Sequence, residues 1–403
     1  MKVTNKISNV LWYLVILPFL FPFGFAEYFS AYKNFRILIL GVATIIILLG
    51  TVYLIIANQG KMKISVPLLV VILYHIVLLI ITLSVQGTIS QGLQKIFISP
   101  AICIFLDMAC RNKMRYTINT ICNLLIIVLA LNLFIFNQWF FPNYFLLSKH
   151  VMFIGHVQVA AEIGLLGVLI GYIEYCYGVY RNKSIVLIIL SLLTMLYSQT
   201  SASFLSIVLL SLFLILRKSH SAQKIVNNHM YLLTFLLLVV YIIVINISRI
   251  PLFAKHYATL TTLLSGRTYI WDTGLKLFYA KPILGYGAYG VLIKVFWSAW
   301  LVNKSGFNYA HNTLLQLLLD GGIVLAIIFI VSIALYIRSE DKKLNNDKIK
   351  YVSHILLLTL LSVGLVESLT EYYYVFIFLS ILPFLYEIDK DKKHSVNYKG
   401  EER

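Results

Sequence analysis

The chain has 403 residues, of which 60% are hydrophobic and only 12% are charged. Soluble domains carry roughly 45–50% apolar and about 25% charged residues, and disordered chains are more polar still. The composition excludes both classes and predicts a polytopic membrane protein. The net charge of +17 requires no nucleic-acid partner, because membrane proteins concentrate Lys and Arg in their cytoplasmic loops.

Apolar runs bounded by charged or turn-forming residues recur along the whole chain. Twelve candidate spans lie near 10–25, 37–57, 64–85, 96–110, 117–136, 157–180, 185–197, 201–216, 230–248, 311–337, 351–367 and 372–387. With the N-terminus inside, the connections on that side hold 22 of the 33 Lys and Arg residues. This asymmetry follows the positive-inside rule. We therefore predict an all-α protein of about twelve spans, forming one membrane domain over 1–403 with a charged cytoplasmic tail at 387–403.

One outer connection, 248–310 between the ninth and tenth predicted spans, is much longer than any other. Its residues Thr268–Ala280 have the apolar spacing of an amphipathic helix. A Pro- and Gly-containing break follows at Lys281–Gly290, and then an apolar, aromatic stretch at Val291–Leu301. Such segments lie along the membrane interface or enter the protein, and loops of this length are usually functional. We predict a catalytic extracytoplasmic loop with interfacial helices.

Of the nine histidines, His311 is the strongest candidate for acid–base chemistry. It opens the tenth predicted span, where the long loop returns to the membrane. The positive end of the helix dipole disfavours the imidazolium there, and a neutral imidazole can accept a proton as a general base. From these residues alone, an interfacial histidine satisfied by water or backbone is the competing interpretation.

The long loop also carries several cations. Arg267 begins the amphipathic helix, and Trp271 lies one turn later on the same face. Because a guanidinium binds phosphate oxygens through paired hydrogen bonds, Arg267 is a candidate for holding a diphosphate. The other cations, Arg249 and Lys281 among them, are individually more typical of solvated or snorkelling side chains.

Carboxylates are scarce on the predicted outer side. Glu162 and Glu367 lie within predicted spans, where ionisable residues are functional candidates by default. The Asp-x-Asp string at Asp389–Asp391 lies in the charged tail with no domain around it, and we interpret it as chance. Because no acidic pair clusters on the outer side, we predict neither a metal site nor a cofactor. The four cysteines lie in or beside apolar runs and predict buried side chains.

Two stretches and a later dipeptide form a recognisable pattern. Ser265–Gly290 contains Arg267, a Trp four residues later, and Pro-x-x-Gly-x-Gly with its glycines at Gly285 and Gly287. Ala310–Gly322 contains His-Asn at the start of a span, then an apolar helix and glycines. Glu367 is followed by a serine near the end of the eleventh predicted span. In order and placement, these features resemble the O-antigen polymerase and O-antigen ligase family of bacterial polysaccharide assembly.

The resemblance implies a GT-C-like glycosyltransferase in the bacterial cytoplasmic membrane, with its active site on the outer face. Donor and acceptor would be undecaprenyl-diphosphate-linked oligosaccharides, and the product a capsule, exopolysaccharide or O-antigen polymer. His311 would deprotonate the acceptor hydroxyl and Arg267 would hold the diphosphate, in an inverting and metal-independent transfer. Asn312 would orient the base or bind sugar. Further substrate-binding candidates are Trp271, Lys281, Arg249, Gly285, Gly287, Glu162 and Glu367.

The sequence departs from the family pattern at Gln199–Phe204, where relatives often carry an Arg after Ser. Either one phosphate contact is missing or Arg249 or Lys281 supplies it. The expected partners, besides membrane lipids, are the flippase and the chain-length regulator of the same pathway. Two alternatives remain: a ligase that moves finished polymer to another acceptor, and a transporter or flippase of lipid-linked oligosaccharide. Cations in the middle of the spans and an internal sequence repeat would favour a transporter, and we find neither in the sequence.

Overall fold

The computed structural model describes residues 13–57, 64–85, 87–89, 92, 94–177, 180–294, 307 and 309–387. Regular structure in this part of the chain is helical, apart from a hairpin of β1 (Val151–Met152) with β2 (Gly155–His156) and one isolated bridge between Ile293 and Phe307. The predicted all-α class is confirmed.

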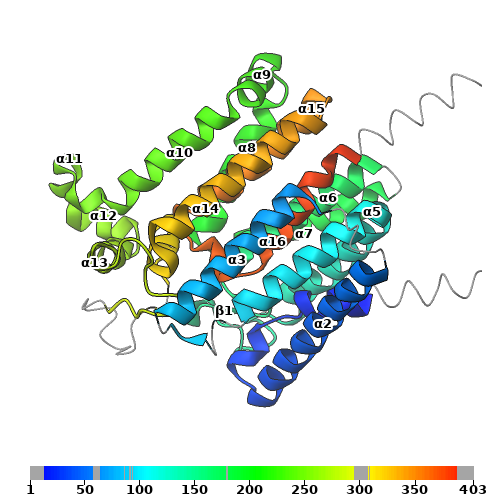
Figure 1. Cartoon of the computed structure of the whole chain (residues 1–403), viewed down its shortest axis with the longest axis horizontal. Helices are drawn as coiled ribbons and strands as arrows, with labels where there is room; N and C mark the ends of the chain where they lie inside the picture. The colour runs from blue at the N-terminus through cyan, green and yellow to red at the C-terminus, as the bar shows by residue number, and fades with distance from the viewer. Residues whose placement is uncertain are drawn as a thin grey trace, which may run out of the picture.

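The longer helices run side by side as a bundle (Figure 1). They are α2 (Ser30–Ala57), α3 (Val66–Ser84), α5 (Ser99–Ala130), α6 (Val159–Tyr177), α7 (Arg181–Ser198), α8 (Ser201–Leu216), α10 (Met230–Ile245), α14 (Thr313–Lys343) and α15 (Asp347–Val363). Three helices of the predicted outer loop gather at one end of α10, and α9 (His220–Asn228) lies at its other end (Figure 1). The three are α11 (Pro251–Ala254), α12 (Tyr257–Leu263) and α13 (Arg267–Ala280).

Several helices are long and apolar enough to cross a membrane. Within the described ranges there are six of them, or seven if the bent pair of α8 and α9 counts as one span. The multi-pass class is therefore confirmed, whereas the number twelve stays a prediction. Two predicted spans, 96–110 and 117–136, lie almost entirely in one continuous helical run, Lys95–Ile135, most of which is α5. The helix is broken at Lys113 (φ −146°, ψ 50°).

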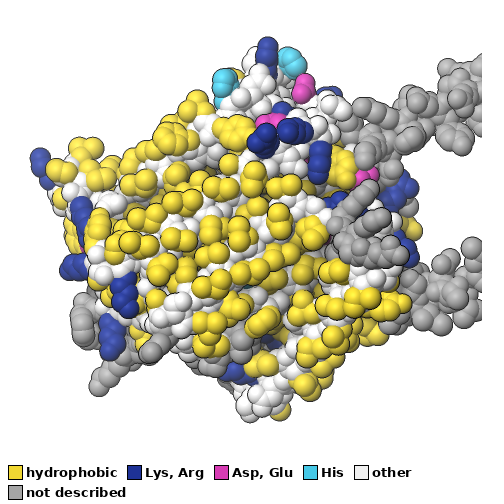
Figure 2. All heavy atoms as spheres, viewed as in Figure 1, with side chains coloured by type: hydrophobic (Ala, Val, Ile, Leu, Met, Phe, Trp, Pro, Cys, Tyr) yellow, Lys and Arg dark blue, Asp and Glu magenta, His cyan; other side chains and the backbone are white. Residues whose placement is uncertain are grey.

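The surface matches this class. Figure 2 shows hydrophobic side chains covering a broad central band, with Lys and Arg gathered toward its ends. On α2, for example, Leu49 is 65% exposed and Ile56 is 71% exposed. Large apolar surfaces of this kind are covered by lipid in a membrane protein.

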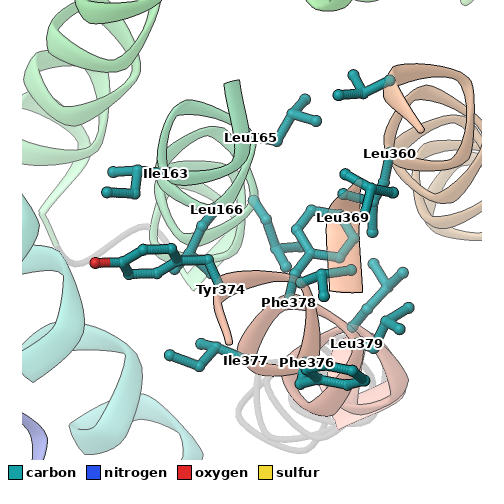
Figure 3. Close-up of a cluster of buried hydrophobic side chains, with 14 of the residues drawn as sticks. Ile163, Leu165, Leu166, Leu360, Leu369, Tyr374, Phe376, Ile377, Phe378 and Leu379 are labelled. Atoms are coloured by element: carbon teal, nitrogen blue, oxygen red, sulfur yellow. The ribbon is translucent and has the colours of Figure 1, made fainter. Parts of the chain in front are cut away.

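The core depends on α16 (Tyr374–Ile381), a short helix whose residues are all buried. Because it is apolar on every side, α16 can pack against α5 and α6 at once. Figure 3 shows part of this core, with Leu166 of α6, Leu360 of α15 and Phe378 of α16 among its side chains. The packing of α16 anchors the turn that precedes it, and this turn carries Glu367.

The boundary of one predicted span is wrong in a way that affects the site. The eleventh span was predicted over 351–367, but α15 ends at Val363. The backbone carbonyl of Gly364 then accepts a hydrogen bond from the N–H of Thr313, at 2.8 Å. The turn after α15 is thus hydrogen-bonded to the beginning of α14. Glu367 lies in this turn and not in a helix.

The predicted orientation can be tested by cysteine labelling. Lys276 in α13 and Lys342 near the end of α14 are both exposed. In intact cells, an impermeant maleimide should label Lys276→Cys, and should label Lys342→Cys only after permeabilisation. Replacing the half-buried Cys176 with Ser removes background. Labelling of both positions from the same side would contradict the predicted topology.

Candidate active site

His311 precedes α14 in a backbone conformation that few residues adopt. Its φ of +49° lies in the left-handed region, which is uncommon for residues other than glycine. The next residue, Asn312, caps α14, because its Oδ1 accepts a hydrogen bond from Leu315 N at 3.0 Å. Asn312 Nδ2 also donates to Leu365 O at 3.0 Å. The Asn312 side chain thus ties the start of α14 to the turn after α15 and fixes the backbone beside His311.

The imidazole of His311 contacts the protein through one of its two nitrogens. Nδ1 lies 2.9 Å from Gln158 Nε2 and 3.7 Å from Glu367 Oε1. The Tyr309 ring packs on the imidazole at 4.4 Å between centroids, and its hydroxyl donates to Gln158 Oε1 at 3.2 Å. Because the Gln158 amide nitrogen faces Nδ1, Nδ1 accepts this hydrogen bond and the neutral ring carries its hydrogen on Nε2. Turning the Gln158 amide over places its oxygen at Nδ1, and Nε2 is then the basic nitrogen.

Glu367 lies next to the histidine, and Glu162 is a second buried acidic residue near Glu367. Glu367 is fully buried, and its Oε2 has no hydrogen-bond partner in the described chain. Glu162, in the first turn of α6, is 1% exposed, and both of its oxygens lack such partners there. The two charges are close enough to interact. Buried carboxylate oxygens with spare acceptor capacity can receive hydroxyl groups of a ligand.

His156 lies just before α6, close to the same carboxylates. Burial lowers its pKa to about 4, although the nearby Glu367 opposes that shift. Its ring stacks on that of His150 at 5.7 Å between centroids. At neutral pH, His156 is therefore an uncharged neighbour of the site.

Arg267 begins α13 and is only 8% exposed. Burial lowers the pKa of its guanidinium from the ordinary value, and the nearby Glu367 carboxylate opposes the shift. An Arg side chain remains protonated in proteins even so. The Nε of Arg267 has no hydrogen-bond partner among the described residues. The site thus contains a buried cation with an unused donor.

Trp271 connects this cation to the histidine. It is 1% exposed, and its Nε1 donates to the carbonyl oxygen of Ala310 at 3.1 Å. Because Arg267 lies one turn before Trp271 and His311 directly follows Ala310, one hydrogen bond sets the relative position of the two candidate catalytic residues. The predicted contact of Trp271 with substrate stays a prediction.

The two other candidate cations are exposed and have partners within the loop. Arg249 Nε lies 3.8 Å from Asp272 Oδ1, and Lys281 Nζ lies over the Tyr286 ring, 4.8 Å from its centroid. The turn at Gln199–Phe204 holds a cluster of bonded hydroxyls and no cation. Whether Arg249 or Lys281 replaces the missing Arg stays a prediction.

Gly285 and Gly287 let the Lys281–Gly290 segment approach a break in α14. The break lies at Gly321 and Gly322, whose dihedral angles are not helical. A Cβ on Gly285 would lie 2.4 Å from the carbonyl oxygen of Leu319, and Gly287 has a φ of +77°. Both glycines therefore have a structural reason to be glycine, and their predicted contact with substrate stays a prediction.

Sequence reasoning missed an ion cluster behind the site. Lys95, in the π-helical turn η2 (Gln94–Ile98), is 8% exposed, and its Nζ lies 2.6 Å from Glu371 Oε1 and 3.7 Å from Asp320 Oδ2. The three residues of this cluster come from three separate parts of the chain. The only signal in the sequence was a single Lys directly before an apolar run.

The described residues contain no group of three or more His, Cys, Asp or Glu side chains placed to hold a metal ion. Near His311, Glu367 Oε1 faces the imidazole, whereas Glu367 Oε2 and both oxygens of Glu162 have no hydrogen-bond partner among the described residues. What these residues can supply is a base, an anion-binding cation and hydroxyl acceptors. Such a set suits the transfer of a group that leaves as an anion.

Residues 186–330 match the family model described as O-antigen ligase. The matched segment contains Arg267, Trp271 and His311 of the sequence pattern and ends before Glu367. No curated protein is significantly similar to the chain. The family match over residues 186–330 of this multi-pass membrane protein confirms the resemblance to the O-antigen ligase and polymerase family.

Proposed function

We propose that the protein is a polysaccharide polymerase that joins undecaprenyl-diphosphate-linked repeat units on the outer face of the bacterial cytoplasmic membrane. The observation that carries the proposal is the pairing of two groups. His311 has its Nδ1 2.9 Å from Gln158 Nε2 and 3.7 Å from Glu367 Oε1, and Arg267 is a buried guanidinium whose charge interacts with the same Glu367 carboxylate.

In the proposed reaction, the Gln158 amide is turned so that its Oε1 accepts a hydrogen bond from His311 Nδ1–H, which leaves Nε2 as the basic nitrogen. Nε2 accepts the proton of the acceptor hydroxyl while that oxygen bonds to the anomeric carbon of the donor. The bond from that carbon to the diphosphate oxygen breaks, and the diphosphate lipid leaves with the electron pair. Arg267 stabilises the charge that develops on the leaving oxygen. Glu367, 3.7 Å from Nδ1, stabilises the imidazolium. Attack opposite the leaving group inverts the anomeric centre.

An apolar cavity supports a lipid-linked donor. It has a volume of about 220 Å³ and lies between α10, α14 and α15, with only a few polar atoms on its walls. Thr313 lines one end, two residues after His311. A polyprenyl chain in this cavity would keep its diphosphate at the level of the site. We extend the proposal to twelve spans, a GT-C-like architecture, and a flippase and chain-length regulator as partners.

The second candidate function is that of a ligase, and the description of the matching family favours it. A ligase and a polymerase can share the same base and diphosphate site and differ in the acceptor. The purified protein should be incubated with the lipid-linked oligosaccharide extracted from cells lacking it. A ladder of product lengths would support a polymerase. Transfer to an added foreign acceptor, without a ladder, would show a ligase.

The reaction should not need a metal ion. We expect the same rate of chain elongation by the purified protein in EDTA as in buffer, because Arg267 carries the charge stabilisation that a metal would otherwise provide. The measurement is the length distribution of the products at fixed times. A loss of elongation in EDTA that Mg²⁺ or Mn²⁺ restores would disprove metal independence.

A further inference from the structure

A chain of hydrogen bonds runs from the buried ion cluster to the backbone beside His311. Asp320 Oδ1 accepts from Gln316 Nε2 at 2.9 Å, and Gln316 Oε1 in turn accepts from Ala310 N at 2.8 Å. The other side of Asp320 faces Lys95 at 3.7 Å. Gln316 is 2% exposed and Asp320 is 3% exposed, so water does not compete for these bonds.

Ala310 is therefore held on both sides of its backbone. Its N–H donates to Gln316 and its carbonyl accepts from Trp271. The next residue is His311, whose φ of +49° is in the left-handed region. This conformation costs free energy and persists only where the surrounding structure imposes it. These two bonds are the restraints on its N-terminal side, and the cap at Asn312 is the restraint on the other.

Lys95 holds the far end of this chain. It lies between Asp320 and Glu371, with its Nζ 4.6 Å from the centroid of the Tyr289 ring. A buried carboxylate without a cation is strongly unfavourable, and Lys95 supplies the opposite charge beside Asp320. The main chain adds two restraints, because Tyr286 N donates to Leu319 O at 2.8 Å and Gly287 N to Asp320 O at 3.0 Å.

We propose that Gln316 is a positioning residue for the general base, and that Asp320 and Lys95 hold Gln316 in the orientation that this requires. The inference rests on the proposed function, because these hydrogen bonds can affect activity only if His311 is the general base. It adds three residues to the site that no motif indicated. None of the three contacts substrate; each acts through the peptide before His311.

The test uses the full-length protein and the lipid-linked oligosaccharide extracted from cells lacking it, with release of polyprenyl diphosphate as the readout. This readout is the same for a polymerase and a ligase. Gln316→Leu should lower kcat about 10²-fold, the cost of a displacement of about 1 Å at a catalytic group. The KM for the lipid-linked donor should stay within about twofold of the wild-type value, because the diphosphate contacts remain.

A second variant keeps the test valid if Gln316→Leu does not fold. Gln316→Glu retains an acceptor for Ala310 N but places a second carboxyl beside Asp320, with Lys95 and Glu371 behind it. When one of the two carboxyl groups is protonated, its O–H replaces the Gln316 amide as the hydrogen-bond donor between positions 316 and 320. The ratio of variant to wild-type activity should therefore rise as the pH falls from 8 to 6, which a purely structural defect would not produce.

Tyr336→Phe is the matched control. Tyr336 lies in the same helix and is 2% exposed, and its hydroxyl bonds to Ser353 in a separate buried cluster with Glu340. Its kcat should be unchanged. A normal kcat for Gln316→Leu, together with an inactive His311→Gln, would overturn this inference and leave the proposed function standing. Normal turnover by His311→Gln would overturn the proposed function itself.

Discussion

His311→Gln should reduce chain elongation by about 10²–10⁴-fold at unchanged membrane levels, which is the usual contribution of a general base. The Gln side chain can still hydrogen-bond to Gln158 or to an acceptor hydroxyl, but it cannot take up a proton. Donor binding should largely persist, because the diphosphate contacts lie on Arg267. The measurement is the rate of elongation with purified lipid-linked repeat unit, together with donor affinity.

Two other histidines serve as controls for this substitution. His256 is exposed in the same predicted outer loop, and His354 is fully buried in α15. Gln at either position should leave elongation close to wild type. If His311→Gln elongates normally, the base lies elsewhere, and the unpartnered carboxylates of Glu162 and Glu367 become the next candidates.

Arg267→Lys should lose about 10- to 100-fold of the activity while the protein still folds. Removing one contact to a developing anion typically costs about 10²–10³-fold, and Lys retains the charge while losing the planar pair of donors. The strongly hydrated ammonium is also less suited than a guanidinium to a site that is only 8% exposed. Steady-state kinetics with the lipid-linked donor would measure the loss.

The control for Arg267→Lys is the same change at Arg338, an exposed residue toward the other end of α14. Arg338→Lys should be fully active. A fully active Arg267→Lys variant would reduce Arg267 to a positive charge or a structural residue, and the diphosphate would need another partner. Arg249 and Lys281 would then be the residues to change next.

Local sequence was sufficient for the membrane class and for much of the site. Apolar content decides whether the segments of a chain can insert into a membrane, and it follows directly from the composition. The helix predicted over 268–280 is α13, and Arg267 begins it as expected. The sequence predicts His311 at the start of a helix because His-Asn precedes an apolar run, and the structure adds that Asn312 is the cap of α14.

Only the tertiary structure shows which distant residues contact His311 and the other site residues. Gln158 lies 153 positions before His311, and Lys95 lies 276 positions before Glu371. Hydropathy patterns report which face of a helix is apolar, and they carry no information on which polar side chains satisfy one another across a bundle. The same limit explains why α15 was extended through Glu367. That turn is apolar in sequence, and α15 ends before it because the carbonyl of Gly364 is bonded to the start of α14.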